Sequence, residues 1–289
     1  MRFQNFLKCT VSALFVLLTM ASSCCAATVS KDDVDFRKKV FVNAAGKKLP
    51  YRLFVPVTYS RDIKYPLVFW LHGGEGRGSD NLAQITRGNS LGSHFWISAE
   101  NQAKFPAFVF APQCPVGDNW SDPELNLPTT ALQLALEALT SVEKEFSIDL
   151  DRVYIVGQSM GGLGVYSLLQ LYPERWAGAI VMCAFDSFTN VPALTHVPLW
   201  VFQGDEDETV PINLVRDMMK QLRKAHANLR YTEYRRGTHE IWFKAFAEPD
   251  LIPWLSSQKR GEPAAPATSG PTSPTPQGQV GSSAPSPNN

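Results

Sequence analysis

The chain has 289 residues, of which 44% are hydrophobic and 19% are charged. Such a chain can bury a substantial core, so wholesale disorder is excluded. Lysine and arginine total 27, and so do aspartate and glutamate, which gives a formal net charge of zero. Without a basic excess to neutralise phosphates, no nucleic-acid partner is predicted. The sequence contains no Cys-x-x-Cys or His-Glu-x-x-His spacing, so it predicts no metal site.

The N-terminus has the three parts of a secretory signal peptide. Arg2 and Lys8 form a basic start, an apolar run covers 11–21, and small residues continue to Ala27. The run is shorter than the roughly 20 apolar residues that a membrane-spanning helix needs. We therefore predict a signal peptide over 1–27 and a secreted or periplasmic protein. Two alternatives stay open: an uncleaved membrane anchor, and a lipid on Cys24 or Cys25 that would bind the protein to a membrane.

Short apolar runs alternate with helical patterns through the middle of the chain. Several of these runs are almost continuously apolar, which is typical of strands covered on both faces. Strands that alternate with helices predict an α/β domain, in which a mostly parallel sheet has helices on both faces. The predicted strands are 51–55, 67–71, 106–111, 152–157, 177–183, 199–204 and 230–234, and the predicted helices are 129–146, 161–171 and 212–225.

The composition changes after Trp254. From Pro263 to Asn289 the sequence has no aromatic residue and consists of Pro, Ser, Thr, Gly, Ala, Gln and Asn apart from Val280. Such a segment cannot bury enough apolar surface to offset its ordering entropy. We predict one globular domain over 28–256 and a disordered tail over 257–289.

Ser159 is the candidate nucleophile. It lies in the segment Gly-Gln-Ser-Met-Gly, from Gly157 to Gly161, between a predicted strand and a predicted helix. A sharp strand-to-helix turn leaves no room for side chains two residues before and two residues after the serine, which explains both glycines. The hydroxyl is then exposed at a helix N-terminus, where backbone N–H groups face a developing oxyanion. A purely structural glycine-rich turn is the alternative.

A glycine-rich loop follows another predicted strand, in the order His-Gly-Gly-Glu-Gly-Arg-Gly from His72. Its backbone N–H groups can approach a substrate closely, and a tetrahedral intermediate needs two such donors. We assign one donor to Gly74, with Gly73 and Glu75 as alternatives, and the other to Met160. A phosphate loop is disfavoured because the Gly-x-x-x-x-Gly-Lys-Ser/Thr pattern is absent. His72 is interpreted as a structural residue that holds the loop.

His239 is the candidate general base. It follows the last predicted strand, at the edge of the sheet where parallel strands end and functional groups gather. The other histidines outside the glycine-rich loop either precede a strand or lie in no motif. The strand 199–204 is followed by four consecutive acidic residues, Asp205 to Glu208. One of these carboxylates would fix the tautomer of the imidazole and stabilise its protonated form.

Together these segments resemble the α/β-hydrolase fold over 50–254. The resemblance is carried by Leu-His-Gly-Gly-Glu-Gly-Arg-Gly-Ser-Asp-Asn, by Ala-Pro-Gln-Cys-Pro followed by Trp120, by Gly-Gln-Ser-Met-Gly-Gly, and by Gly-Asp-Glu-Asp-Glu-Thr-Val-Pro. These motifs are most similar to those of small, often secreted esterases of the phospholipase/carboxylesterase, feruloyl-esterase-like and dienelactone-hydrolase-like groups. Dienelactone hydrolases proper use a cysteine nucleophile, so their activity is disfavoured here.

The resemblance implies a triad of Ser159, Asp207 and His239, because the family's layout Gly-x-x-Asp-x-x-Val-Pro favours Asp207 over Asp205. It implies hydrolysis of a carboxylic ester through an acyl-enzyme, with no cofactor and with a small-molecule or polymer-linked ester as partner. The rate should fall in acid, where the histidine becomes protonated. Two alternatives stay open: a serine peptidase of the prolyl-oligopeptidase type, and a catalytically idle hydrolase fold that acts as a binding module.

The resemblance also bears on access to the site and on the cysteines. Many relatives insert a helical lid after the nucleophile helix, but the segment 184–197 is too short for one, so no lid domain and an open site are expected. Trp120 and Trp242 are the candidate substrate-binding residues. The family's sheet order separates Cys114 from Cys183 too widely for a disulfide, so two free thiols are expected.

Overall fold

The computed structural model describes residues 36–122, 128–188 and 190–262. The predicted signal peptide and the tail from residue 263 onward therefore lie outside the described residues. Within the described ranges, no helix combines the length and the apolar character that a membrane crossing needs.

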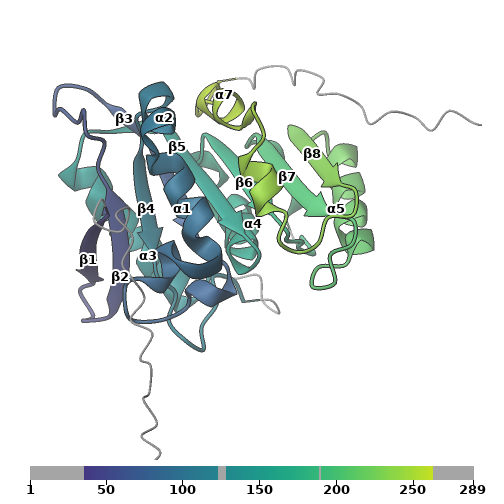
Figure 1. Cartoon of the computed structure of the whole chain (residues 1–289), viewed down its shortest axis with the longest axis horizontal. Helices are drawn as coiled ribbons and strands as arrows, with labels where there is room; N and C mark the ends of the chain where they lie inside the picture. Colours follow the sequence, from purple (N-terminus) through teal and green to yellow (C-terminus); the bar gives the residue numbers. More distant parts are fainter. Residues whose placement is uncertain (1–35, 123–127, 189, 263–289) are drawn as a thin grey trace, which may run out of the picture.

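The centre of the molecule is one eight-stranded sheet. Its strands are β1 (Arg37–Val42), β2 (Lys48–Phe54), β3 (Tyr65–Leu71), β4 (Phe108–Pro112), β5 (Ile148–Gln158), β6 (Gly178–Met182), β7 (Leu199–Gly204) and β8 (Leu229–Tyr234). They lie in the order β1-β2-β4-β3-β5-β6-β7-β8 (Figure 1). β2 runs antiparallel to both of its neighbours, and all other pairs are parallel. The prediction of a mostly parallel sheet is confirmed.

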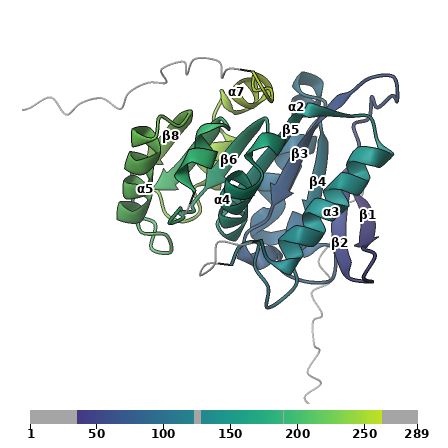
Figure 2. The same ribbon diagram turned by 180° about the vertical axis from the view of Figure 1, so that it is seen from behind.

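Helices cover both faces of the sheet, as predicted. They are α1 (Ser90–Ile97), α2 (Ala99–Lys104), α3 (Thr130–Glu145), α4 (Met160–Leu171), α5 (Ile212–Lys224), α6 (Trp242–Phe246) and α7 (Leu251–Ser256). Figure 1 shows α1, α2 and α7 on the near face, and Figure 2 shows α3, α4 and α5 on the opposite face. The fold is thus the three-layer arrangement that alternating strands and helices predict.

Each face of the sheet has its own hydrophobic core. Successive residues of a strand point to opposite faces. Phe69 of β3 accordingly joins the core under α3 and α4, whereas its neighbours Val68 and Trp70 join the core under α1 and α6. The strands β3, β4, β6 and β7 are buried along their whole length. Burial on both faces explains why their sequences are continuously apolar.

The predicted elements do not include the strand β1 or the helices α1, α2, α6 and α7. For β1 and α1 the reason is visible. The edge strand β1 has only exposed and half-buried residues, so it lacks the apolar run of the inner strands. The helix α1 contains Gly92, which lowers helix propensity. A Cβ at Gly92 would lie 2.1 Å from the indole ring of Trp70. The glycine is therefore explained by the close approach of the helix to the sheet.

The packed domain extends past the boundary predicted at residue 256. Gln258 is buried, and its carbonyl oxygen accepts a hydrogen bond from the Tyr154 hydroxyl at 2.9 Å. Arg260 forms an ion pair with Asp151 at 2.8 Å. Residues 257–262 therefore belong to the domain, and the prediction that the tail begins at 257 is wrong. Composition could not reveal this, because polar residues hold the segment through tertiary contacts.

The connection between β6 and β7 bears on access to the carboxyl ends of the strands. Its described residues form only the short 3₁₀ helix η6 (Val191–Thr195). No lid domain is present in this described part of the chain, as predicted.

Candidate active site

Ser159 lies at a strained turn between β5 and α4. Its backbone angles are φ 52° and ψ −120°, which a residue with a side chain adopts rarely. A Cβ at Gly157 would lie 2.4 Å from the carbonyl oxygen of Gly161, and a Cβ at Gly161 would lie 2.0 Å from that of Leu71. The turn thus requires both glycines, for the steric reason that the sequence indicates.

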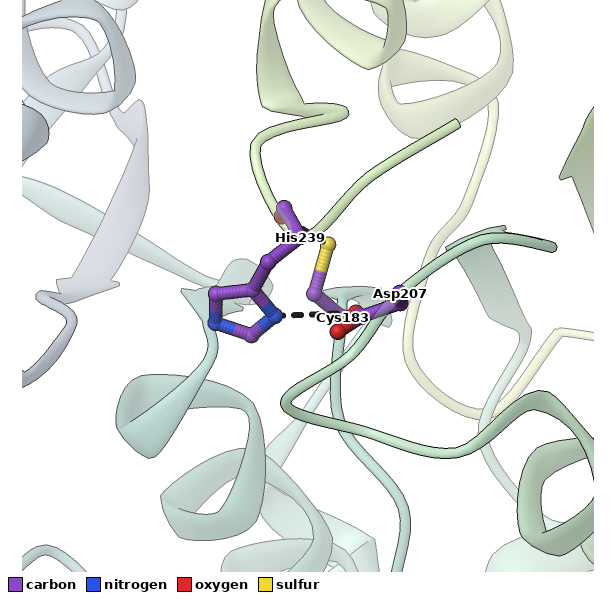
Figure 3. A group of neighbouring side chains, drawn as sticks. All are labelled: Cys183, Asp207 and His239. Atoms are coloured by element: carbon purple, nitrogen blue, oxygen red, sulfur yellow. Dashed lines mark hydrogen bonds and ion pairs between the residues drawn. The ribbon is translucent and has the colours of Figure 1, made fainter. Parts of the chain in front are cut away.

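The structure brings together the three side chains that the sequence analysis selected. Ser159 follows β5, Asp207 follows β7 and His239 follows β8, so all three lie where parallel strands end. His239 Nε2 is 2.9 Å from Ser159 Oγ. On the other side of the ring, His239 Nδ1 is 2.8 Å from Asp207 Oδ2 (Figure 3). A proton can therefore pass between the hydroxyl and the imidazole, with the carboxylate on the far side of the ring.

The carboxylate of Asp207 is held from several directions. Its side chain is fully buried, and Oδ1 accepts hydrogen bonds from the backbone N–H groups of Thr209 and Val210, both at 2.8 Å. Gln203 Nε2 donates to Oδ2 at 2.8 Å. These hydrogen bonds hold the carboxylate in place and fix the oxygen that faces His239. The sequence analysis did not identify Gln203. Its position four residues before Asp207 could have indicated a partner of the acid.

The alternative acid, Asp205, lies elsewhere. Its backbone N–H donates to the carbonyl oxygen of Tyr234 at 3.1 Å, and its Oδ1 is buried with no hydrogen-bond partner among the described residues. It is Asp207, and not Asp205, whose carboxylate contacts the imidazole of His239.

Two glycines allow the acid loop and the histidine loop to lie against each other. A Cβ at Gly204 would lie 2.2 Å from the carbonyl oxygen of Gly237, and a Cβ at Gly237 would lie 2.9 Å from Gly204 Cα. The Gly237 carbonyl also accepts a hydrogen bond from the Glu206 N–H at 2.8 Å. This contact between two backbones sets the spacing at which Asp207 and His239 meet.

The glycine-rich loop is fixed by a pair of buried amide side chains. Asn89 Oδ1 accepts a hydrogen bond from the Gly73 N–H at 2.7 Å. Gln158, the residue before the serine, donates through Nε2 to Asn89 Oδ1 at 3.3 Å and to the Gly88 carbonyl at 2.9 Å. The serine turn and the loop are therefore connected. Because the Gly73 N–H is engaged, Gly74 and Glu75 are the loop residues whose N–H groups are left for an oxyanion.

The other predicted donor, Met160, is the first residue of α4. Its backbone N–H has no acceptor within the helix, as for every residue of a first helical turn. Gly74 and Met160 both line a cavity that reaches Ser159. The two backbone groups named from the sequence thus lie on the wall of the space next to the hydroxyl.

His72 is built into the floor of this loop. Its Nε2 accepts a hydrogen bond from the Cys114 N–H at 3.0 Å, so its Nδ1 carries the proton and donates to the Gly73 carbonyl at 2.6 Å. Complete burial lowers the pKa of His72 to about 4, against the opposing effect of the hydrogen bond to Gly73. His72 is therefore neutral at ordinary pH and has the structural role that the sequence indicates.

The two tryptophans selected as substrate-binding residues lie in different places. Trp120 is completely buried, and its indole Nε1–H donates to the His72 carbonyl at 3.1 Å. The prediction that Trp120 binds substrate is wrong: it packs on His72 below the loop, where no substrate reaches it. Trp242 lines the cavity beside His239, with the two ring centroids 5.8 Å apart.

Two cavities meet at Ser159, and Gly74 and Thr209 line both of them. The first cavity has a volume of about 470 Å³ and includes His239 and Trp242 in its wall. The second has a volume of about 390 Å³ and lies on the other side of the serine. Both volumes fall in the range of small-molecule sites. The serine hydroxyl is thus accessible to a substrate that extends in two directions.

Cys183, Asp207 and His239 form a group whose potential ligand atoms lie within 4.8 Å of one another (Figure 3). These atoms already have partners: the Cys183 thiol donates to the His239 carbonyl at 2.7 Å, and the other two bind each other. Burial raises the pKa of the Cys183 thiol and so disfavours the thiolate that a metal would require. We therefore assign no ion to this group. Cys114 and Cys183 are free thiols, as predicted, and both are buried.

Comparisons with known proteins point in one direction. Residues 128–249 match the family model described as Phospholipase/Carboxylesterase. The fold is similar to that of a thermostable esterase, with a TM-score of 0.75 and 35% sequence identity over 78% of this chain and 64% of that chain. This chain thus spans less than two thirds of that protein's length. A ferulic acid esterase is similar in fold, with a TM-score of 0.59 and 18% identity over 76% of this chain and 97% of that chain. A search of curated sequences finds no significant match.

Proposed function

We propose that this chain, which belongs to the α/β-hydrolase superfamily, is a serine esterase that hydrolyses carboxylic esters. One observation carries the proposal: Ser159 Oγ, the His239 imidazole and the Asp207 carboxylate form a continuous hydrogen-bonded series with distances of 2.9 and 2.8 Å. The match to the phospholipase/carboxylesterase family and the similarity to an esterase at 35% identity support the same reaction.

In the first step, His239 acts as general base for Ser159. Its Nδ1–H donates to Asp207, which leaves Nε2 to accept the hydroxyl proton. As the proton moves to Nε2, Oγ forms a bond to the ester carbonyl carbon and the carbonyl electron pair moves to oxygen. Asp207 stabilises the imidazolium, and the N–H groups of Gly74 and Met160 stabilise the oxyanion.

In the second step, the bond between the carbonyl carbon and the alcohol oxygen breaks. His239 Nε2–H donates its proton to this leaving oxygen, and the acyl group stays on Ser159 Oγ. A water molecule then attacks the acyl carbon while His239 accepts its proton. The bond between this carbon and Ser159 Oγ breaks, His239 returns the proton to Oγ, and the carboxylic acid is released. Every proton in the cycle thus passes through one nitrogen atom.

We also propose that the ester is met outside the cytoplasm. The support is the signal-peptide pattern of residues 1–27, which lie outside the described part of the chain. N-terminal sequencing of protein recovered from the periplasm or the medium tests this, with a mature N-terminus near residue 28 expected. A chain that keeps Met1 and stays in the cytoplasm would contradict it.

The substitution Ser159→Ala tests the esterase reaction. Turnover of p-nitrophenyl acetate should fall by about 10⁶-fold, because only binding and the oxyanion donors then contribute to catalysis. Ser256→Ala, which changes an exposed serine at the end of α7, is the matched control and should keep wild-type turnover. A fluorophosphonate probe should label the wild type and the control but not Ser159→Ala. Undiminished turnover in Ser159→Ala would refute the proposal.

A further inference from the structure

The two cavities that meet at Ser159 differ in charge. The first has two carboxylates in its wall, Glu75 and Glu240. The second has no carboxylate among its lining residues, but it contains the guanidinium of Arg77. An ester bound across the serine therefore meets negative charge on one side and positive charge on the other.

The reaction assigns the two halves of the ester to the two cavities. The leaving alcohol oxygen has to accept a proton from His239 Nε2, so the alcohol lies beside this histidine. His239 lines the first cavity and is not part of the wall of the second. The alcohol half therefore occupies the first cavity, and the acyl half occupies the second, the one with Arg77.

The acyl cavity combines apolar walls with a fixed guanidinium. Leu163, Phe185 and Val210 line it and suit an aliphatic chain. Arg77 Nε donates to the Asp118 carbonyl at 2.7 Å, and Arg77 Nη2 donates to Asn119 Oδ1. Both acceptors are neutral oxygens, and the Asp118 carboxylate accepts instead from the Asn119 N–H at 2.8 Å.

Arg77 keeps donors for a ligand. A guanidinium has five N–H groups; two of them donate to Asp118 and Asn119 and a third to the Cys114 side chain, which leaves two. A Cβ built on Gly74 would lie 3.3 Å from Arg77 Nη1, so this nitrogen lies next to a residue that both cavities share. The free N–H groups of Arg77 are thus close to the position of the bound ester.

We propose that the acyl half of the preferred ester is an aliphatic chain that ends in a carboxylate, and that Arg77 binds this carboxylate. The preferred substrates are then half-esters of dicarboxylic acids. This proposal rests on the esterase reaction proposed above. A planar guanidinium held from behind is suited to a carboxylate, and such a charge-assisted hydrogen bond discriminates against an apolar end by about 10- to 100-fold. Glu75 and Glu240 disfavour the reverse orientation by repulsion.

A merely structural Arg77 would behave differently. If it only held residues 118–119 in place, or only assisted the oxyanion, its loss would lower turnover equally for charged and uncharged acyl groups. The ratio of two substrates that differ only at the end of the acyl chain therefore isolates the proposed contact.

The experiment compares mono-ethyl adipate with ethyl hexanoate, whose acyl chains have equal length and end in a carboxylate and a methyl group. The ratio of kcat/KM for adipate over hexanoate should fall about 10- to 100-fold in Arg77→Met. Asn119→Asp should lower the ratio as well, because it keeps the oxygen that accepts from Arg77 but neutralises the guanidinium. Arg61→Met, which removes an exposed arginine outside both cavities, is the control and should leave the ratio unchanged.

The outcomes separate this inference from the esterase reaction itself. If wild type hydrolyses neither ester, the esterase reaction fails. If wild type hydrolyses ethyl hexanoate but the ratio is the same in Arg77→Met, Asn119→Asp and Arg61→Met, the carboxylate site is overturned. Titration calorimetry of mono-ethyl adipate with Ser159→Ala, alone and combined with Arg77→Met, measures binding without turnover. Equal affinity in the two proteins would also overturn the site.

Discussion

Two regions of the molecule each place a histidine after a parallel strand, His72 after β3 and His239 after β8. Both imidazoles form hydrogen bonds through both ring nitrogens. The partners of His72 are two backbone groups, and the ring is completely buried. The partners of His239 are the Asp207 carboxylate and the Ser159 hydroxyl, and this ring lines a cavity.

The difference shows what makes an imidazole able to transfer protons. The site of His72 contains no carboxylate partner for a positive charge, so burial lowers its pKa to about 4. His239 has a buried carboxylate on one nitrogen and a hydroxyl on the other, so a proton gained from the hydroxyl is stabilised as soon as it arrives. Similar positions at the sheet edge thus serve structure in one case and, in the reaction proposed above, proton transfer in the other.

The largest effect should come from removing the carboxylate that distinguishes the His239 region. Asp207→Asn should lower kcat for p-nitrophenyl acetate by about 10⁴-fold, because the amide favours the wrong tautomer and cannot stabilise the imidazolium. The matched change Asp205→Asn, two residues away in the same acidic run, should alter kcat only a few-fold. Steady-state kinetics check both, and equal losses would contradict the assignment of the acid.

An intermediate effect is expected at Gly73. Its N–H donates a hydrogen bond to Asn89, and its carbonyl accepts one from His72. Asn89→Ala should release the peptide group between residues 72 and 73, which loosens Gly73 and with it the direction of the neighbouring Gly74 N–H toward the oxyanion. We expect kcat to fall by about 10²-fold with little change in KM. Asn89→Asp keeps the acceptor and should recover most of the loss. A change in KM alone would contradict this role.

The smallest effect concerns the stability of the fold in acid. It tests the other region of the comparison, the buried site of His72. Since the folded pKa of about 4 lies below the unfolded value of about 6.5, the unfolded chain binds more protons between these values, and stability falls as the pH decreases through this window. His72 should contribute a loss of about 3 kcal/mol between pH 6.5 and 4.

Urea unfolding of the wild type and of His72→Gln over this pH range measures the contribution. The glutamine variant is less stable at pH 7 but does not titrate, so its free energy of unfolding should decrease less on acidification. Parallel pH dependences of the two proteins would show that His72 does not carry the effect.

The inner strands and the serine turn could be predicted because each depends on local rules. Continuous apolar runs indicate strands buried on both faces, and Gly157 and Gly161 indicate a turn in which two backbones nearly touch. β1 could not be predicted in this way, because an edge strand buries too little to leave an apolar pattern. Trp120 was misassigned because a tryptophan looks the same in sequence whether it lines a cavity or supports a loop from below.

The sequence by itself determined the α/β architecture and the strand-to-helix turn that carries Ser159, since strand periodicity and the spacing of glycines around a turn are properties of a few neighbouring residues. The tertiary structure alone decided what the functional groups contact: Gln203 on the acid, Asn89 on the glycine-rich loop, and Arg77 beside the serine. These contacts join residues far apart in the chain. They arise only when the loops pack against one another, and no local pattern records which side chain then lies opposite which.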